Sequence, residues 1–143
     1  MKSRLFLTVL LVCLVSSPFA RAGDDKDTPL EDQMSAMGRA FKQLRKQAAE
    51  STLGDASLDL VAQMQKTAAA SLELIPEKAA GLPEGERAAF TAAYKEKMQE
   101  MIVALSKLEA ALKAGDKAGA AKYVAELGAM QRSGHKEFRK PKE

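Results

Sequence analysis

The sequence is poor in the side chains that most enzymes and metal sites use. Its 143 residues include one histidine, His135, one cysteine, Cys13, and no tryptophan. If Cys13 is removed with the signal peptide described next, the mature chain has one histidine and no cysteine, which excludes a zinc cluster, a cysteine-ligated iron–sulfur site and a cysteine–histidine catalytic pair. A di-iron bundle needs a Glu-x-x-His motif on two helices and is excluded as well. We therefore expect a protein that is not an enzyme.

The one long apolar run lies at the start of the chain. Lys2 and Arg4 precede the eleven residues LFLTVLLVCLV at 5–15, and Ala-Arg-Ala at 20–22 offers a small-x-small cleavage site. This layout is typical of a secretory signal peptide, and the run is too short to anchor the chain in a bilayer. We predict a signal peptide over residues 1–22, cleavage after Ala22, and a periplasmic mature protein that has no cysteine and no membrane span.

Cleavage also removes the apparent excess of positive charge. Loss of Lys2, Arg4 and Arg21 leaves 19 basic residues against 19 acidic ones, so the net charge falls from +3 to zero. A neutral mature chain gives no reason to expect nucleic-acid binding, and its total charge gives no hint about a docking partner.

Apolar residues recur at steps of three and four along the rest of the chain, which predicts amphipathic helices and no strands. After a flexible lead-in over residues 23–28, we expect one domain over residues 29–143. Short connections between helices favour antiparallel neighbours, so the expected fold is an all-α, up-down-up-down four-helix bundle, monomeric. The first helix is expected from a Thr28 cap and Pro29 to about residue 50, and the second from a cap at Asp55 or Ser57, after a break at Gly54, to Ile75 before Pro76. The third is expected after a turn marked by Gly81, Pro83 and Gly85 and ends at Gly115, and the fourth runs from a cap at Asp116 to a point before Pro141.

This topology brings two possible ligands to the same end of the bundle. Met34 lies about one turn after the start of the first helix, and His135 lies about one turn before the end of the fourth. We expect His135 to align with Gln131 and Phe138 on the inner side of its helix. A methionine and a histidine on opposite sides of a gap are one of the standard axial ligand pairs of haem iron.

Other interpretations fit the same residues. A histidine near a helix C-terminus is often a surface residue that favours the helix dipole, and a methionine on an apolar stripe is often a core residue. A haem-free bundle would be able to bind copper through Met34, Met37 and His135, since thioether and imidazole groups suit Cu(I). A structural or chaperone-like bundle would have no cofactor.

Three segments resemble the cytochrome b562 family of four-helix bundles. Residues 30–34, LEDQM, are similar to the family's N-terminal helix, in which such a run ends at the axial methionine. Residues 132–139, RSGHKEFR, are similar to its C-terminal segment, in which an aromatic residue and an arginine follow the axial histidine. Residues 111–117, ALKAGDK, resemble its turn between the third and fourth helices.

The resemblance implies a periplasmic one-electron carrier with one non-covalently bound haem b, held by Met34 and His135 as axial ligands. It does not identify the redox partner. The chain departs from the family pattern at Gln131, where the family has an arginine, and at Gly134, where an aromatic residue is usual. The family's haem-packing phenylalanines have no clear counterpart, and we expect this wall to be formed by Phe90, Tyr94 and Met101.

Overall fold

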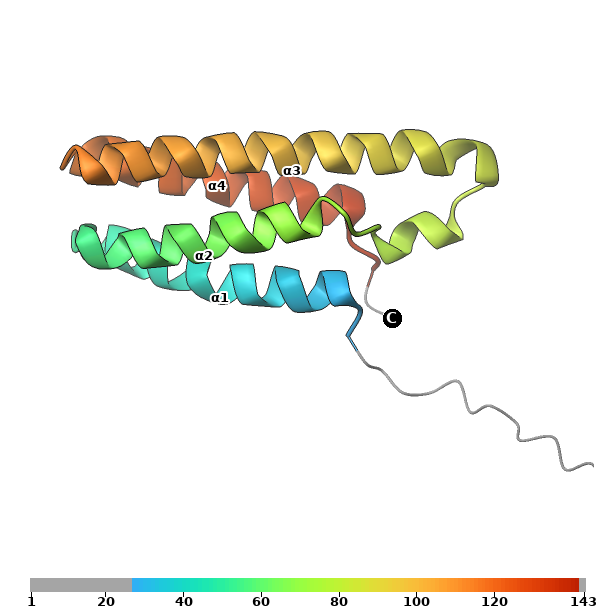
Figure 1. The fold of residues 1–143 in the computed structure, drawn as a ribbon, viewed down its shortest axis with the longest axis horizontal. Helices are drawn as coiled ribbons and strands as arrows, with labels where there is room; N and C mark the ends of the chain where they lie inside the picture. The colour runs from blue at the N-terminus through green and yellow to red at the C-terminus, as the bar shows by residue number, and fades with distance from the viewer. Residues whose placement is uncertain (1–26, 142–143) are drawn as a thin grey trace, which may run out of the picture.

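The structure, a computed structural model, describes residues 27–141, and the predicted signal peptide lies outside the described residues. It contains four α-helices that run alternately up and down, so the predicted all-α four-helix bundle is confirmed (Figure 1). The helices are α1 (Pro29–Ala49), α2 (Asp55–Ser71), α3 (Glu84–Lys113) and α4 (Lys117–Phe138), and a 3₁₀ helix, η1 (Glu77–Gly81), connects α2 to α3.

Local capping residues determine where α1 and α4 begin. The Thr28 hydroxyl accepts a hydrogen bond from the Glu31 backbone N–H, and the Glu31 carboxylate accepts one from the Thr28 backbone N–H. This reciprocal pair satisfies two N–H groups that a helix start leaves without partners. Before α4, Gly115 adopts a φ of 69°, which costs glycine little, and the Asp116 carboxylate accepts from the Gly119 backbone N–H.

The region between α2 and α3 differs from our expectation in two ways. We expected the second helix to continue to Ile75, but α2 ends at Ser71. In a continuing helix the Ser71 carbonyl would accept from residue 75, whereas here it accepts from the Leu74 backbone N–H at 3.2 Å and from the Tyr94 hydroxyl of α3 at 3.0 Å. We also expected Gly85 in a turn, but α3 begins at Glu84, directly after Pro83.

The core runs along the axis of the bundle and is made of aliphatic side chains from all four helices. Helix α1 packs on α2, α2 on α3 and α3 on α4, while α1 and α4 close the ring through a smaller contact. No helix among residues 27–141 combines the length and the hydropathy needed to cross a bilayer. The largest aliphatic side chains with almost no exposed surface are Leu44, Val61, Leu105, Leu108 and Leu127.

Candidate functional site

The start of α1 and the end of α4 lie at the same end of the bundle, which we call the N/C end (Figure 1). Met34 belongs to the second turn of α1, directly after the capped first turn. His135 belongs to the last turn of α4, where its carbonyl accepts a hydrogen bond from the Arg139 backbone N–H at 3.2 Å. The two predicted ligands are therefore carried by neighbouring antiparallel helices.

A contact deeper in the bundle fixes the register between α1 and α4. A Cβ atom added at Gly128 would lie 3.7 Å from the ring of Phe41, which is an ordinary van der Waals distance, so the Phe41 ring of α1 lies beside α4 at Gly128. Met34 precedes Phe41 by seven residues, and His135 follows Gly128 by seven. Seven residues are about two helical turns, or roughly 10 Å along the axis. Because the helices are antiparallel, both steps lead toward the N/C end, and Met34 and His135 lie at matching depth on the α1–α4 side.

The two side chains differ in how far the bundle covers them. Met34 is half-buried and packs against the edge of the core. His135 is exposed, although we expected it on the inner side with Phe138. In the last turn of α4 the buried residue is Phe138, and His135 lies about 60° away from it around the helix, on the side of Gly128.

Three aromatic rings fill the α3–α4 side of the N/C end. The Phe138 ring lies edge-on to Phe90 and Tyr94, with ring centroids 5.3 and 5.6 Å away. Burial raises the pKa of Tyr94 to about 12, although the hydrogen bond from its hydroxyl to Ser71 opposes this shift. Phe90 and Tyr94, which we expected to form a cofactor wall, thus pack on Phe138, while Met101 is half-buried against the core.

The protonation state of His135 suits a ligand. Partial burial of the imidazole lowers the pKa of His135 below its usual value, and the positive charge of Arg139 lowers this pKa further. The imidazole is therefore neutral at pH 7, which is the form that binds metal ions. Arg139 follows His135 by one helical turn, so the same segment that carries the ligand keeps it deprotonated.

Two glycines near the predicted ligands have open space around them. Gly38, one turn further along α1, would place an added Cβ atom with nothing within 4 Å, and the same holds for Gly134 beside His135. No group of three or more His, Cys, Asp or Glu side chains in the described part of the chain is arranged to hold a metal ion. The donor set thus consists of one thioether and one neutral imidazole, which fits a haem iron that already has four porphyrin nitrogens.

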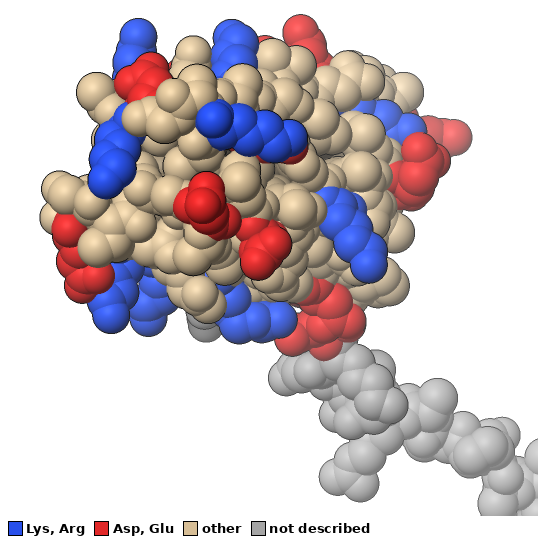
Figure 2. Space-filling model, turned by 60° about the vertical axis from the view of Figure 1, so that its left-hand side comes forward, with Lys and Arg blue, Asp and Glu red and all other residues tan. Residues whose placement is uncertain are grey.

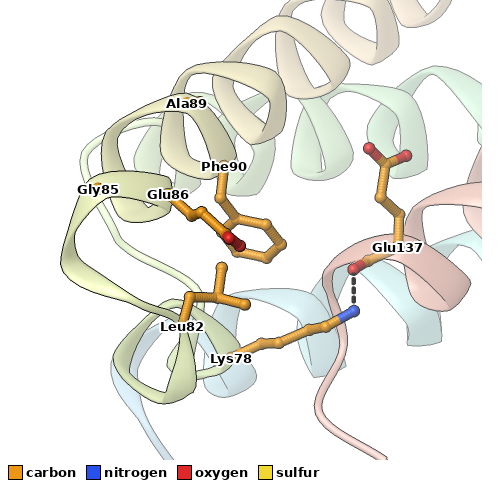
Figure 3. Close-up of a pocket in the computed structure, with 7 residues that line it drawn as sticks. All are labelled: Lys78, Leu82, Gly85, Glu86, Ala89, Phe90 and Glu137. Carbon is orange, nitrogen blue, oxygen red and sulfur yellow. Dashed lines mark hydrogen bonds between the residues drawn. The ribbon is translucent and has the colours of Figure 1, made fainter.

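The sequence did not indicate that η1 supports the end of α4. The Lys78 ammonium group donates a hydrogen bond to the Glu137 carbonyl, as Figure 3 shows, and lies 5.9 Å from the centre of the Phe90 ring. Lys140 forms an ion pair with Glu77 at 3.2 Å. These partners are 59 and 63 residues apart, so no local pattern predicts them.

An open pocket of about 500 Å³ lies between η1, the start of α3 and the end of α4 (Figure 3). Neither Met34 nor His135 lines it, so it is separate from the proposed ligand pair. Its lining residues are Lys78, Leu82, Gly85, Glu86, Ala89, Phe90 and Glu137.

Comparison with known proteins identifies the family. The family model of cytochrome b562 matches residues 29–139, from the first residue of α1 to the residue after α4. The chain belongs to the cytochrome b562 family. Members of this family are electron carriers rather than enzymes, and membership implies a b-type cytochrome with haem b. A search of curated proteins found no match.

Proposed function

We propose that this cytochrome b562 family member carries single electrons by means of one non-covalently bound haem b, with Met34 and His135 as the axial ligands. The observation that carries the proposal is the register of α1 and α4. The position of the Phe41 ring beside Gly128 supports a similar depth for Met34 and His135 at the N/C end. When bound, the haem iron supplies the one-electron chemistry, and a methionine ligand favours its ferrous state.

The residues of the chain would hold and orient the group. Met34 offers a thioether from a helix whose start is fixed by the Thr28–Glu31 capping box. His135 offers a neutral imidazole from a helix end that is held by Lys78. Because both helices are anchored at the N/C end, Met34 and His135 would hold the iron with little reorganisation of the chain, which would favour rapid electron exchange.

The test is the visible absorption spectrum of the reduced and oxidised protein with haem. We expect a six-coordinate, low-spin spectrum for the native chain and its loss in Met34→Leu and His135→Gln. Met130→Leu is the matched control, because Met130 is also a half-buried methionine at the edge of the core. Retention of the native spectrum in both ligand variants would overturn the assignment.

We also propose that the mature protein begins at Gly23 in the periplasm. The support is the sequence alone: a positive start, an apolar run of eleven residues and the Ala-Arg-Ala site. The mass of the protein recovered from the periplasm of its native host tests this. A mass that includes residues 1–22 would contradict the proposed cleavage.

A further inference from the structure

The outer face of α1 carries an uninterrupted group of positive charges. Arg39, Lys42, Arg45 and Lys46 are all exposed, and no acidic residue lies between Asp32 and Glu50. Figure 2 shows basic side chains along the lower edge of the molecule, where α1 runs, and acidic side chains at its junction with the grey segment.

Arg132 extends this group across to α4. Its guanidinium lies 3.6 Å from where a Cβ atom of Gly128 would be, and the Phe41 ring lies 3.7 Å from the same point. Arg132 is therefore at the line where α1 meets α4, and on the α1 side Arg45 lies over the ring of Phe41, 6.0 Å from its centre. We call Arg39, Lys42, Arg45, Lys46 and Arg132 the basic face.

The charges of the basic face are largely unneutralised. Lys46 has an ion pair with Glu50, at 3.8 Å and well exposed. Within residues 27–141, the other four members have no carboxylate within ion-pair distance. Positive charges that lie close together repel one another and make the local electrostatic potential positive. An acidic partner that binds there reduces this repulsion.

The basic face also lacks an apolar anchor. The large hydrophobic side chains most exposed in the described part of the chain, Ile75 and Val103, belong to the α2–α3 connection and to α3. A surface rich in charge and free of exposed apolar groups suits a transient encounter with another soluble protein. It does not suit insertion into a membrane, which requires apolar side chains.

The position of the basic face relates it to the proposed ligands. Arg39 follows Met34 by five residues, and Arg132 precedes His135 by three, which are distances of about 8 and 5 Å along the helices. We propose that the basic face docks an acidic redox protein beside the haem edge. One electron then passes between the partner's redox centre and the haem iron, and no atom is transferred. This inference rests on the proposed function.

The first experiment measures the rate at which an acidic flavodoxin in its hydroquinone form reduces the oxidised haem protein. The variant Arg39→Glu/Lys42→Glu changes the charge by four units on the basic face. The control Lys95→Glu/Lys107→Glu makes the same change at exposed positions on α3. At low ionic strength we expect the basic-face variant to react about tenfold more slowly and the control less than about twofold. Near 1 M salt, where the screening length is about 3 Å, the two should converge.

A neutral variant and a basic electron acceptor test whether the charge of the basic face causes the change in rate. The neutral variant Arg39→Gln/Lys42→Gln should slow the reaction by an intermediate factor, because it removes two charges instead of reversing them. With a basic cytochrome c as the electron acceptor, the basic-face variant should react faster than the native protein. Equal slowing of the basic-face and control variants would overturn the inference.

Direct binding gives a readout that does not depend on electron transfer. Titration with the acidic flavodoxin should shift the amide resonances of α1 and of the end of α4 in a two-dimensional NMR spectrum. Shifts confined to α2 and α3, or binding to vesicles of anionic phospholipid without binding to flavodoxin, would overturn the docking proposal. If the native protein supplied with haem gave no haem spectrum, the proposed function would be refuted. The NMR titration would still test whether the basic face binds the acidic flavodoxin.

Discussion

His135 lies at the boundary between protein and solvent, and this position controls when its imidazole carries a proton. Its pKa is lowered by partial burial first and by the charge of Arg139 second. On α1, hydrogen bonds with Thr28 lower the pKa of Glu31, and the charge of Arg139 lowers this pKa further. The positive charge of Arg139 therefore acts on both groups: it disfavours protonation of the His135 imidazole and stabilises the negative Glu31 carboxylate.

The lowered pKa of His135 predicts a pH dependence of stability in the haem-free protein. The unfolded chain binds this proton near pH 6.5, and the folded chain binds it only at lower pH. The free energy of unfolding should therefore fall as the pH drops from above 6.5 through the folded-state pKa. Urea unfolding over a pH series should show this fall in the native chain and a weaker one in His135→Gln. An NMR titration that gives His135 a pKa of 6.5 or above would contradict the prediction.

At the scale of the elements, η1 joins the α2–α3 connection to the end of α4. Lys78 satisfies the Glu137 carbonyl, one of the last carbonyls of a helix that have no partner within the helix. The Lys140–Glu77 ion pair adds a second link between the same two elements. The helix end that carries His135 is thus held by a segment that carries neither of the two proposed ligands.

Removal of this link should loosen α4 locally. Lys78→Ala is expected to cost about 0.5–1 kcal/mol of unfolding free energy, since one partly exposed hydrogen bond is lost. Amide exchange should accelerate in the last turn of α4 and remain unchanged at its start. Lys95→Ala, at an exposed position on α3, is the control, and Lys78→Arg should restore most of the protection. Equal effects of the two alanine variants on exchange would show that η1 does not support this helix end.

The elements also show which features a sequence pattern can predict. The starts of α1 and α4 depend on caps three residues away, at Thr28–Glu31 and Asp116–Gly119, and both were predicted correctly. The end of α2 depends on Tyr94, which is 23 residues from Ser71, and it was predicted wrongly. Local chemistry determines the first kind of boundary and tertiary packing the second.

The same distinction applies to the candidate site. The expected depth of Met34 and His135 follows from helix order and length, so the sequence alone suggested this pair, and their role as ligands stays a prediction. The exposure of His135 depends on the orientation of α4 about its axis, which Phe138 fixes by packing on Phe90 and Tyr94. The links made by Lys78 and Glu77 join distant segments, and helical periodicity carries no signal for them.

At the scale of the whole molecule, charge is unevenly distributed although its total is small. The outer face of α1 is basic, whereas α2 carries two carboxylates and one lysine. Such an asymmetry orients an approaching partner even when the net charge is near zero, because the local potential and not the total charge acts at short range. Summed composition therefore gave no hint of the basic face that the folded chain displays.

Haem binding should stabilise the whole bundle, because a ligand that binds only the folded state shifts the unfolding equilibrium. At a free haem concentration of about 100 times the Kd, the gain is about 2.7 kcal/mol, which corresponds to a rise in Tm of roughly 10 °C for a domain of this size. His135→Ala should lose most of this rise and leave the haem-free Tm almost unchanged, because the side chain is exposed and makes no core contact. Lys95→Ala should retain both values. Scanning calorimetry with and without haem measures these differences. A His135→Ala protein that gains as much from haem as the native chain would mean that the group is held without this ligand.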